Sequence, residues 1–153
     1  HRLVTSGTHS GHGIFGPPTG RRFTIRAIAD CYCIAGRITD EWLVRDGSGI
    51  ALQLGLDPEA LVASWIAAEG GPAAARRPFS PADDVPGPYR GRGNDSEWGA
   101  RLADILRAIM DKDFAVIGRD CDRAVRTEHP GARGGWGRAF AETEWMRLRA
   151  AFP

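Results

Sequence analysis

The residue types best suited to chemistry in this sequence are three cysteines and four histidines. Cys31 and Cys33 form a C-x-C pair inside an apolar stretch, which puts both thiols on one face of a strand. A structural zinc site uses four ligands, and the neighbouring sequence offers no third or fourth one. We therefore interpret the cysteines as buried free thiols of a reducing cytoplasm, and we expect neither a metal nor another cofactor.

The histidines have no partners at catalytic spacing. None of them combines with a serine, a cysteine or an aspartate into a recognisable constellation. His129 precedes Pro130 at the end of a short expected strand, where it either contacts a ligand or serves the structure. The GPPTG segment at 16–20 is followed by neither a helix nor a Lys-Ser/Thr pair, so no phosphate site is expected there.

The sequence divides into three parts. Residues 1–66 carry strand patterns and end in a short helical stretch, whereas residues 95–153 are mostly helical. Between them, residues 67–94 hold five of the ten prolines and five glycines, a composition typical of a linker. The organisation is therefore a sheet-rich part, a Pro/Gly-rich linker and a helical part.

Three strands are expected in the first part, and the second and third of them form a hairpin around Ala35-Gly36. They are Arg2–Thr8, Arg22–Ile34 and Arg37–Arg45.

In the helical part, Asn94, with a glutamate three residues later, predicts the cap of a first helix. Asp113 predicts the cap of a second short helix. A short strand from Ala124 to Glu128 and a Gly/Pro loop follow, and a third helix is expected from about Gly137.

The composition limits the classes of function that the chain can have. The 153 residues suit one domain, with 42% hydrophobic and 25% charged residues. A net charge of +1 argues against binding of nucleic acid or an anionic membrane. No apolar run approaches the roughly 18 residues of a membrane span. Because the sequence begins at His1 in a strand-like stretch, we expect a processed or truncated piece of something longer.

Three stretches resemble the SnoaL-like polyketide cyclase family: GTHSGHGIFGPPTGRRF at 7–23, AGRITDEW at 35–42 and QLG at 53–55. The resemblance covers residues 1–57. It implies an α+β class and the cone-shaped fold of nuclear-transport-factor-2-like proteins, with a curved antiparallel sheet against three helices. Residues 95–153 look like the other half of that domain, which comes first in the family and second here.

Three forms fit this reversed order. The chain is a piece of a tandem protein, a circular permutant, or a domain-swapped dimer in which two chains exchange halves. The two halves are complementary, and we favour one complete cone, built within a chain or by exchange.

The resemblance also implies where catalytic residues would lie. In the cyclases an aspartate acts as acid and base, helped by a histidine and a glutamine on the neighbouring strand. These positions fall on Leu43, Ala29 and Ala27. Because none of these side chains can transfer a proton, the family mechanism cannot run here.

The side chains of the two hairpin strands must alternate between two faces. For the pocket residues to meet on one face, Ala29 must lie opposite Leu43, whereas a plain two-residue turn would place it opposite Trp42. We therefore predict a three-residue loop or a β-bulge near Gly36.

The remaining acid/base candidate is Glu41, which either acts as the base or pairs with an arginine at the rim of the cavity. His9, in the GTHSG motif, either assists at the edge of the pocket or fixes its loop. Small inner-face residues leave room for a ligand unless Trp98 or Phe114 fills it. The expected ligand-binding residues are Ala27, Ala29, Cys31, Thr39, Leu43, Trp98 and His129.

The opposite face of the hairpin is mostly apolar, although a solvated face should be polar. We therefore expect it to be covered by a second copy in a homodimer, since proteins with this fold commonly pair through it. The anchoring residues are Ile28, Tyr32, Ile38, Trp42 and Val44.

Three functions follow. The first is a cytoplasmic domain that binds a small, mostly apolar molecule. The second is a lyase- or isomerase-type enzyme without a cofactor, acting on a small carbonyl compound with Glu41 as base. The third is a non-catalytic dimerisation module. No partner among nucleic acids or membranes is expected.

Overall fold

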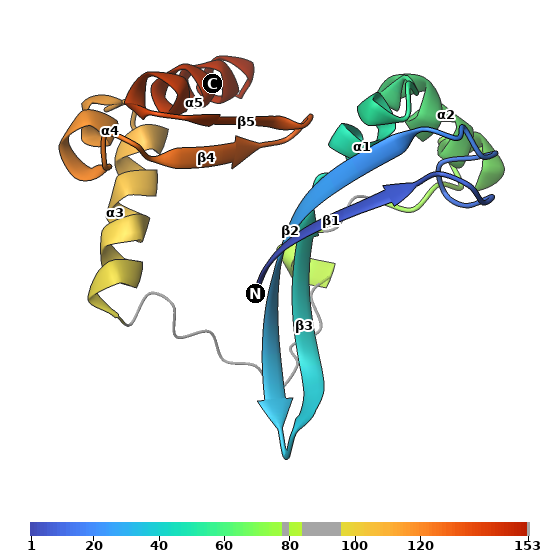
Figure 1. Cartoon of the computed structure of the whole chain (residues 1–153), viewed down its shortest axis with the longest axis horizontal. Helices are drawn as coiled ribbons and strands as arrows, with labels where there is room; N and C mark the ends of the chain where they lie inside the picture. The colour runs from blue at the N-terminus through green and yellow to red at the C-terminus, as the bar shows by residue number, and fades with distance from the viewer. Residues whose placement is uncertain (78–79, 84–95, 153) are drawn as a thin grey trace. The chain divides into compact units, whose positions relative to one another are not determined.

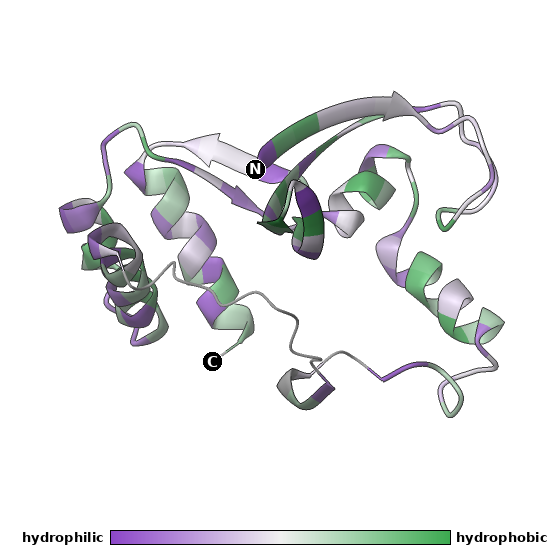
Figure 2. Ribbon diagram, turned by 90° about the horizontal axis from the view of Figure 1, so that it is seen from below, coloured by the Kyte–Doolittle hydropathy of each residue, from purple (hydrophilic) through white to green (hydrophobic). Residues whose placement is uncertain are grey.

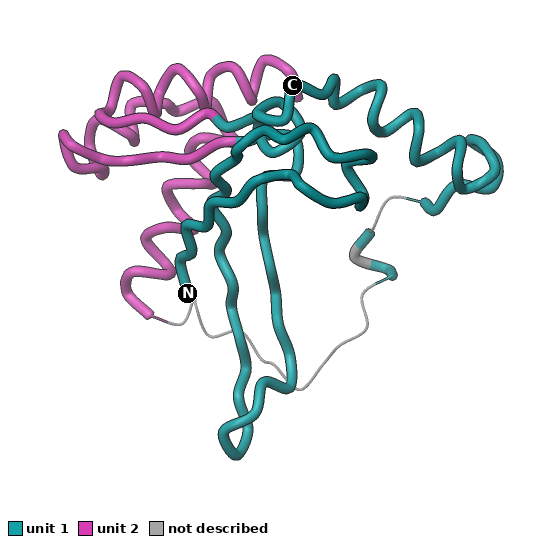
Figure 3. The backbone as a smooth tube through the Cα atoms, turned by 45° about the vertical axis from the view of Figure 1, so that its right-hand side comes forward, with its two compact units in different colours: residues 1–89, 130–132 teal, residues 90–129, 133–153 magenta. Residues whose placement is uncertain are grey.

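The structure is a computed structural model, and it describes residues 1–77, 80–83 and 96–152. The chain folds as two compact units, one made of residues 1–89 with 130–132 and the other of residues 90–129 with 133–153 (Figure 3). Both units mix helices and strands, so the predicted α+β class is confirmed.

The first unit is built on an antiparallel sheet in the order β1-β2-β3 (Figure 1). Its strands are β1 (Arg2–Thr8), β2 (Arg22–Ile34) and β3 (Arg37–Arg45), with the bounds that the sequence predicted. In β2, the odd-numbered residues from Phe23 to Cys31 are buried or half-buried and the even-numbered residues are exposed, in line with the alternation of side chains along a strand.

The turn between β2 and β3 contains two residues, Ala35 and Gly36, both with positive φ. The register shifts between Tyr32 and Cys33, and Thr39 is the extra residue of the resulting bulge on β3. The bulge brings Ala29 opposite Leu43. The predicted bulge is therefore confirmed.

The register defines two faces of the sheet. The odd-numbered face carries Ala27, Ala29 and Cys31 opposite Arg45, Leu43 and Glu41. The even-numbered face carries Ile28, Asp30 and Tyr32 opposite Val44, Trp42 and Asp40. Ile38 pairs with Cys33, because the bulge shifts it out of register with Tyr32 and Ile28. Its predicted place on the even-numbered face is therefore wrong.

Two helices complete the first unit, α1 (Gly47–Gln53) and α2 (Pro58–Ala68), together with the short 3₁₀ helix η1 (Pro81–Asp83). Helix α1 contacts β2, and the side chain of Gln53 exchanges two hydrogen bonds of 2.9 Å with the backbone of Thr24. These bonds hold α1 against the strand. The buried hydrophobic residues of this unit are Ala27, Ala29, Ile50, Ala51 and Leu54.

The second unit contains helices and one hairpin. Its elements are α3 (Glu97–Met110), α4 (Ala115–Asp120), β4 (Arg126–His129), β5 (Arg133–Trp136) and α5 (Arg138–Ala151). Hydrophobic and hydrophilic residues alternate along α5, as in a helix with one buried side (Figure 2). The core consists of Ile109, Val116, Ile117 and Ala141.

Two predicted caps differ from the structure. Asn94 lies outside the described residues, and the hydroxyl of Ser96 accepts from Gly99 N as the N-cap of α3. Phe114 occupies the N-cap position of α4, so Asp113 does not cap that helix through its side chain. Strand β5 lies in a segment that was expected to be a loop. It was not expected because two of its four residues are glycines, which are rare in strands.

Among the described helices, none has the length and hydrophobicity that a membrane-spanning segment requires.

Candidate functional site

The odd-numbered face gathers most of the predicted ligand-binding residues. Leu43, on the edge strand β3, lies opposite Ala29 of the central strand and is 43% exposed, whereas both alanines of this face are buried. Cys31 with Glu41 and Ala27 with Arg45 flank this pair. The accessible apolar side chain of Leu43 therefore lies between the acidic Glu41 on one side along β3 and the basic Arg45 on the other.

Cys31 and Glu41 interact directly. The thiol of Cys31 donates a hydrogen bond of 3.7 Å to Oε1 of Glu41. Desolvation, followed by the negative charge of Glu41, raises the pKa of the Cys31 thiol. A protonated thiol is a weak nucleophile and a weak metal ligand, and the described residues contain no cluster that could hold a metal ion. These findings do not favour covalent chemistry at Cys31.

Glu41 is exposed, and within the described part of the chain no arginine or lysine lies within ion-pair distance of it. A general base must be held against the reacting group of a substrate, and an exposed side chain on an edge strand is not enclosed with one. Its geometry therefore gives little support to general-base catalysis.

His9 lies in the loop between β1 and β2. The N–H of Thr19 donates to Nδ1 of His9 at 3.3 Å, and the Thr19 hydroxyl lies 3.2 Å from the same nitrogen. The ring also makes an edge-to-face contact with Phe15 at 6.4 Å. These contacts join the two ends of the loop, which supports the structural alternative for His9.

His129 and Trp98 belong to the second unit. The His129 ring makes edge-to-face contacts with Phe140 at 6.2 Å and Trp145 at 5.6 Å, and its buried Nε2 has no hydrogen-bond partner among the described residues. Desolvation lowers the pKa of His129. His129 therefore packs as a neutral ring against α5, while Trp98 is exposed at the start of α3.

Next to His129 lies an ion pair between a buried carboxylate and an exposed arginine. Glu144 is only 6% exposed, and Arg133 donates to both of its carboxylate oxygens at 2.7 and 2.6 Å. This bidentate pair lowers the pKa of Glu144. It ties β5 to α5, so the carboxylate is structural.

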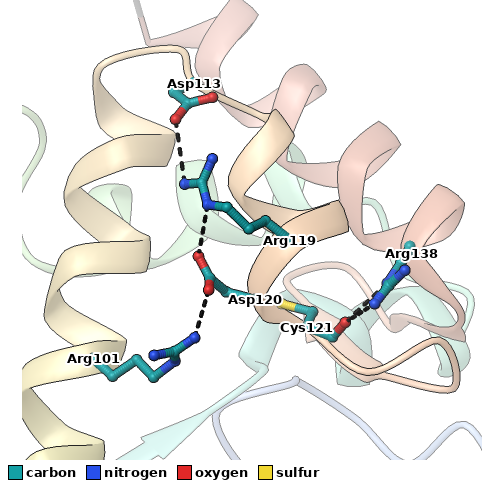
Figure 4. A network of polar contacts seen from close by, with 6 residues as sticks. All are labelled: Arg101, Asp113, Arg119, Asp120, Cys121 and Arg138. Carbon is teal, nitrogen blue, oxygen red and sulfur yellow. Dashed lines mark hydrogen bonds and ion pairs between the residues drawn. The ribbon is translucent and has the colours of Figure 1, made fainter.

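A polar network holds the helices of this unit together (Figure 4). Arg101 on α3 and Arg119 on α4 both contact the carboxylate of Asp120, at 2.6 and 3.3 Å. Arg138, at the start of α5, donates two hydrogen bonds to the carbonyl of Cys121. Arg101 therefore links α3 to α4, and Arg138 links α5 to the residue that follows α4, so these two guanidinium groups position helices.

Asp46, which no sequence pattern had singled out above, accepts hydrogen bonds from four donors. Oδ1 accepts from the Ser48 hydroxyl and from the N–H groups of Gly49 and Gly131, and Oδ2 accepts from Ala132 N–H. A Cβ at position 49 would collide with this carboxylate, so glycine is needed there. The Asp-Gly-Ser-Gly pattern of a helix start was the available signal.

Comparison of the chain with protein-family models, with curated proteins and with solved structures found no match.

Proposed function

We propose that the chain is a non-catalytic, SnoaL-like domain that binds a small, mostly apolar molecule on the odd-numbered face of its sheet. The observation that carries the proposal is the register of Leu43 opposite Ala29. It leaves an accessible apolar side chain on this face, on the edge strand β3, with Glu41 and Arg45 beside it for orientation of a polar group.

The enzyme alternative receives less support from the site. The positions that the resemblance assigns to acid/base chemistry carry Leu43, Ala29 and Ala27. Glu41 is exposed, and Cys31 is held as a thiol. Binding needs none of these groups to move a proton, so binding is the function that the arrangement supports best.

The test is a titration with N-phenyl-1-naphthylamine, a neutral probe that fluoresces in apolar surroundings. The variant Leu43→Lys is expected to weaken binding of the probe by about tenfold, because a charge replaces an exposed apolar side chain of this face. Val44→Lys is the matched control, since the neighbouring residue points to the even-numbered face. Equal loss in both variants, or no loss in Leu43→Lys, would rule out this face as the binding site.

The even-numbered face favours a second role, homodimerisation. Ile28 and Val44 lie opposite each other and are 62% and 70% exposed, with Trp42 and Tyr32 also exposed on this face. Exposed apolar and aromatic side chains on one face, here with Asp30 and Asp40 among them, are typical of an interface. We propose that a second copy covers it.

Sedimentation velocity at micromolar concentration is expected to show self-association of the unmodified chain and a lower mean mass in Ile28→Lys. Ile28 lies on the central strand β2, so its replacement affects the face and leaves the edge of the sheet unchanged. The matched control is Ile14→Lys, an equally exposed residue of the loop before β2. A monomeric unmodified chain would contradict the proposal.

The reversed order of the two halves stays part of the proposal. The first unit supplies the strands that resemble the back half of a SnoaL-like cone, and α3 to α5 resemble its front half. Circular permutation or domain swapping accounts for this order. Three free cysteines suit the cytoplasm as the compartment.

A further inference from the structure

Strand β3 lies at an edge of its sheet. It is nine residues long and pairs with β2 on one side, and within the described residues no strand pairs with its other side. An edge of this length presents a row of backbone N–H and C=O groups that can pair with another strand. It contains no proline or lysine to prevent such pairing.

The half of β3 next to α1 is the part best suited to pairing. Residues 41–45 pair regularly with β2, because the bulge at Thr39 lies beyond them. Trp42, Leu43 and Val44 are all exposed, so both faces of the strand are apolar at this edge. Glu41 and Arg45, at the two ends of the segment, carry opposite charges.

These charges select a register for self-pairing. When two copies of β3 pair antiparallel about Leu43, Glu41 of each copy lies opposite Arg45 of the other, and Trp42 lies opposite Val44. Pairing about Glu41 instead would place like charges opposite each other, Glu41 on Glu41 and Arg37 on Arg45. Pairing about Thr39 would run through the bulge.

We infer that β3 pairs edge to edge with β3 of a second copy, in the register that places Glu41 opposite Arg45. The two three-stranded sheets then form one sheet of six strands, related by a twofold axis at Leu43. Each Glu41 gains the arginine partner that it lacks within the described chain. The inference does not depend on ligand binding or on pairing through the even-numbered face.

The other edge strand, β1, is less suited to this role. Arg2 is its only charged residue, so a second copy of β1 would offer no opposite charge and no preferred register. The charge pattern therefore assigns self-pairing to β3.

A charge-reversal cycle tests the inference. Sedimentation equilibrium of the full chain is expected to show that Glu41→Arg and Arg45→Glu each raise the dissociation constant by about tenfold, because each places two pairs of like charges opposite each other. The double variant should restore the constant to near that of the unmodified chain. Arg37→Glu, on the same strand outside the paired segment, should leave it unchanged. Circular dichroism checks that every variant folds.

Oxidative cross-linking tests the register directly. With Leu43→Cys, two thiols on opposed residues lie close enough for a disulfide, so covalent dimers should form with copper phenanthroline. The unmodified chain, with its three native cysteines, and Thr39→Cys are the controls. The inference is overturned if the single charge variants associate like the unmodified chain, if the double variant is as weak as the singles, or if Leu43→Cys cross-links no better than the controls. The same measurements are also made in chains that carry Ile28→Lys, in which the even-numbered face no longer pairs, so that the association measured there reports the edge of β3 alone.

Discussion

Ile109→Ala is expected to lower the free energy of unfolding of the second unit by about 3 kcal/mol. Ile109 is 1% exposed and lies in the core with Val116, Ile117 and Ala141. Removing three carbons there loses the free energy of their burial and leaves a cavity that the surrounding helices fill only in part.

Hydrogen–deuterium exchange, read peptide by peptide, is the suitable measurement because the chain has two units. The loss of protection should be concentrated in α3, α4 and α5. Leu102→Ala is the matched control, since it makes a similar change on the same helix at a residue that is 56% exposed. It should cost about 1 kcal/mol or less.

Equal effects of the two substitutions would contradict the assignment of the core. They would mean that the exposed side of α3, which carries Trp98, Leu102, Leu106 and Met110, contributes as much to stability as the buried side.

The sheet could be predicted from the sequence because its signals are local. Alternation of side chains and the Ala-Gly turn defined the strands. The bulge was predicted because Ala29 had to lie opposite Leu43, and the observed register has both this pair and the bulge. The same bulge moved Ile38, because an extra residue at Thr39 changes the pairing of the residues between it and the turn.

The predictions that failed depended on contacts between distant residues or on weak local signals. Asn94 and Asp113 have the residue type of helix caps, but the cap is decided by where the backbone turns, and that is at Ser96 and Phe114. Strand β5 has two glycines among its four residues and is defined by its pairing with β4.

The candidate site could be predicted only in its local part. The alternation placed Glu41 and Leu43 on one face, and the structure brings Cys31 into contact with Glu41. Exposure could not be predicted, because it depends on what packs over the face. Glu41 is exposed while Ala29 is buried, a difference that no residue type reveals.

Asp46→Ala is expected to destabilise the first unit by about 3 kcal/mol. Loss of the N-cap of α1 costs about 1 kcal/mol. The N–H groups of Gly131 and Ala132, in the segment 130–132 of the same unit, lose a charged acceptor at 3.0 and 2.6 Å, which adds about 2 kcal/mol. Urea denaturation near neutral pH, with exchange of the α1 backbone as the local probe, measures the loss.

Asp57→Ala is the matched control. Asp57 caps α2 through one hydrogen bond of 3.0 Å to Glu59 N–H and has no further acceptor role among the described residues. Its replacement should therefore cost about 1 kcal/mol, the value of a single cap. If the two substitutions cost the same, the bonds from Asp46 to residues 131 and 132 contribute nothing to stability.

The stabilisation by Asp46 also depends on pH in a predictable direction. Partial desolvation raises its pKa, but the hydrogen bonds from Ala132, Gly131, Gly49 and Ser48 outweigh this, so the pKa lies below the ordinary value of 3.8. The contribution is therefore fully present well above pH 3.8 and is lost as the pH falls through the lowered pKa. In acid, the unmodified chain should approach the stability of Asp46→Ala. A stability difference that stays constant down to pH 2 or so would show that the charge of Asp46 plays no part.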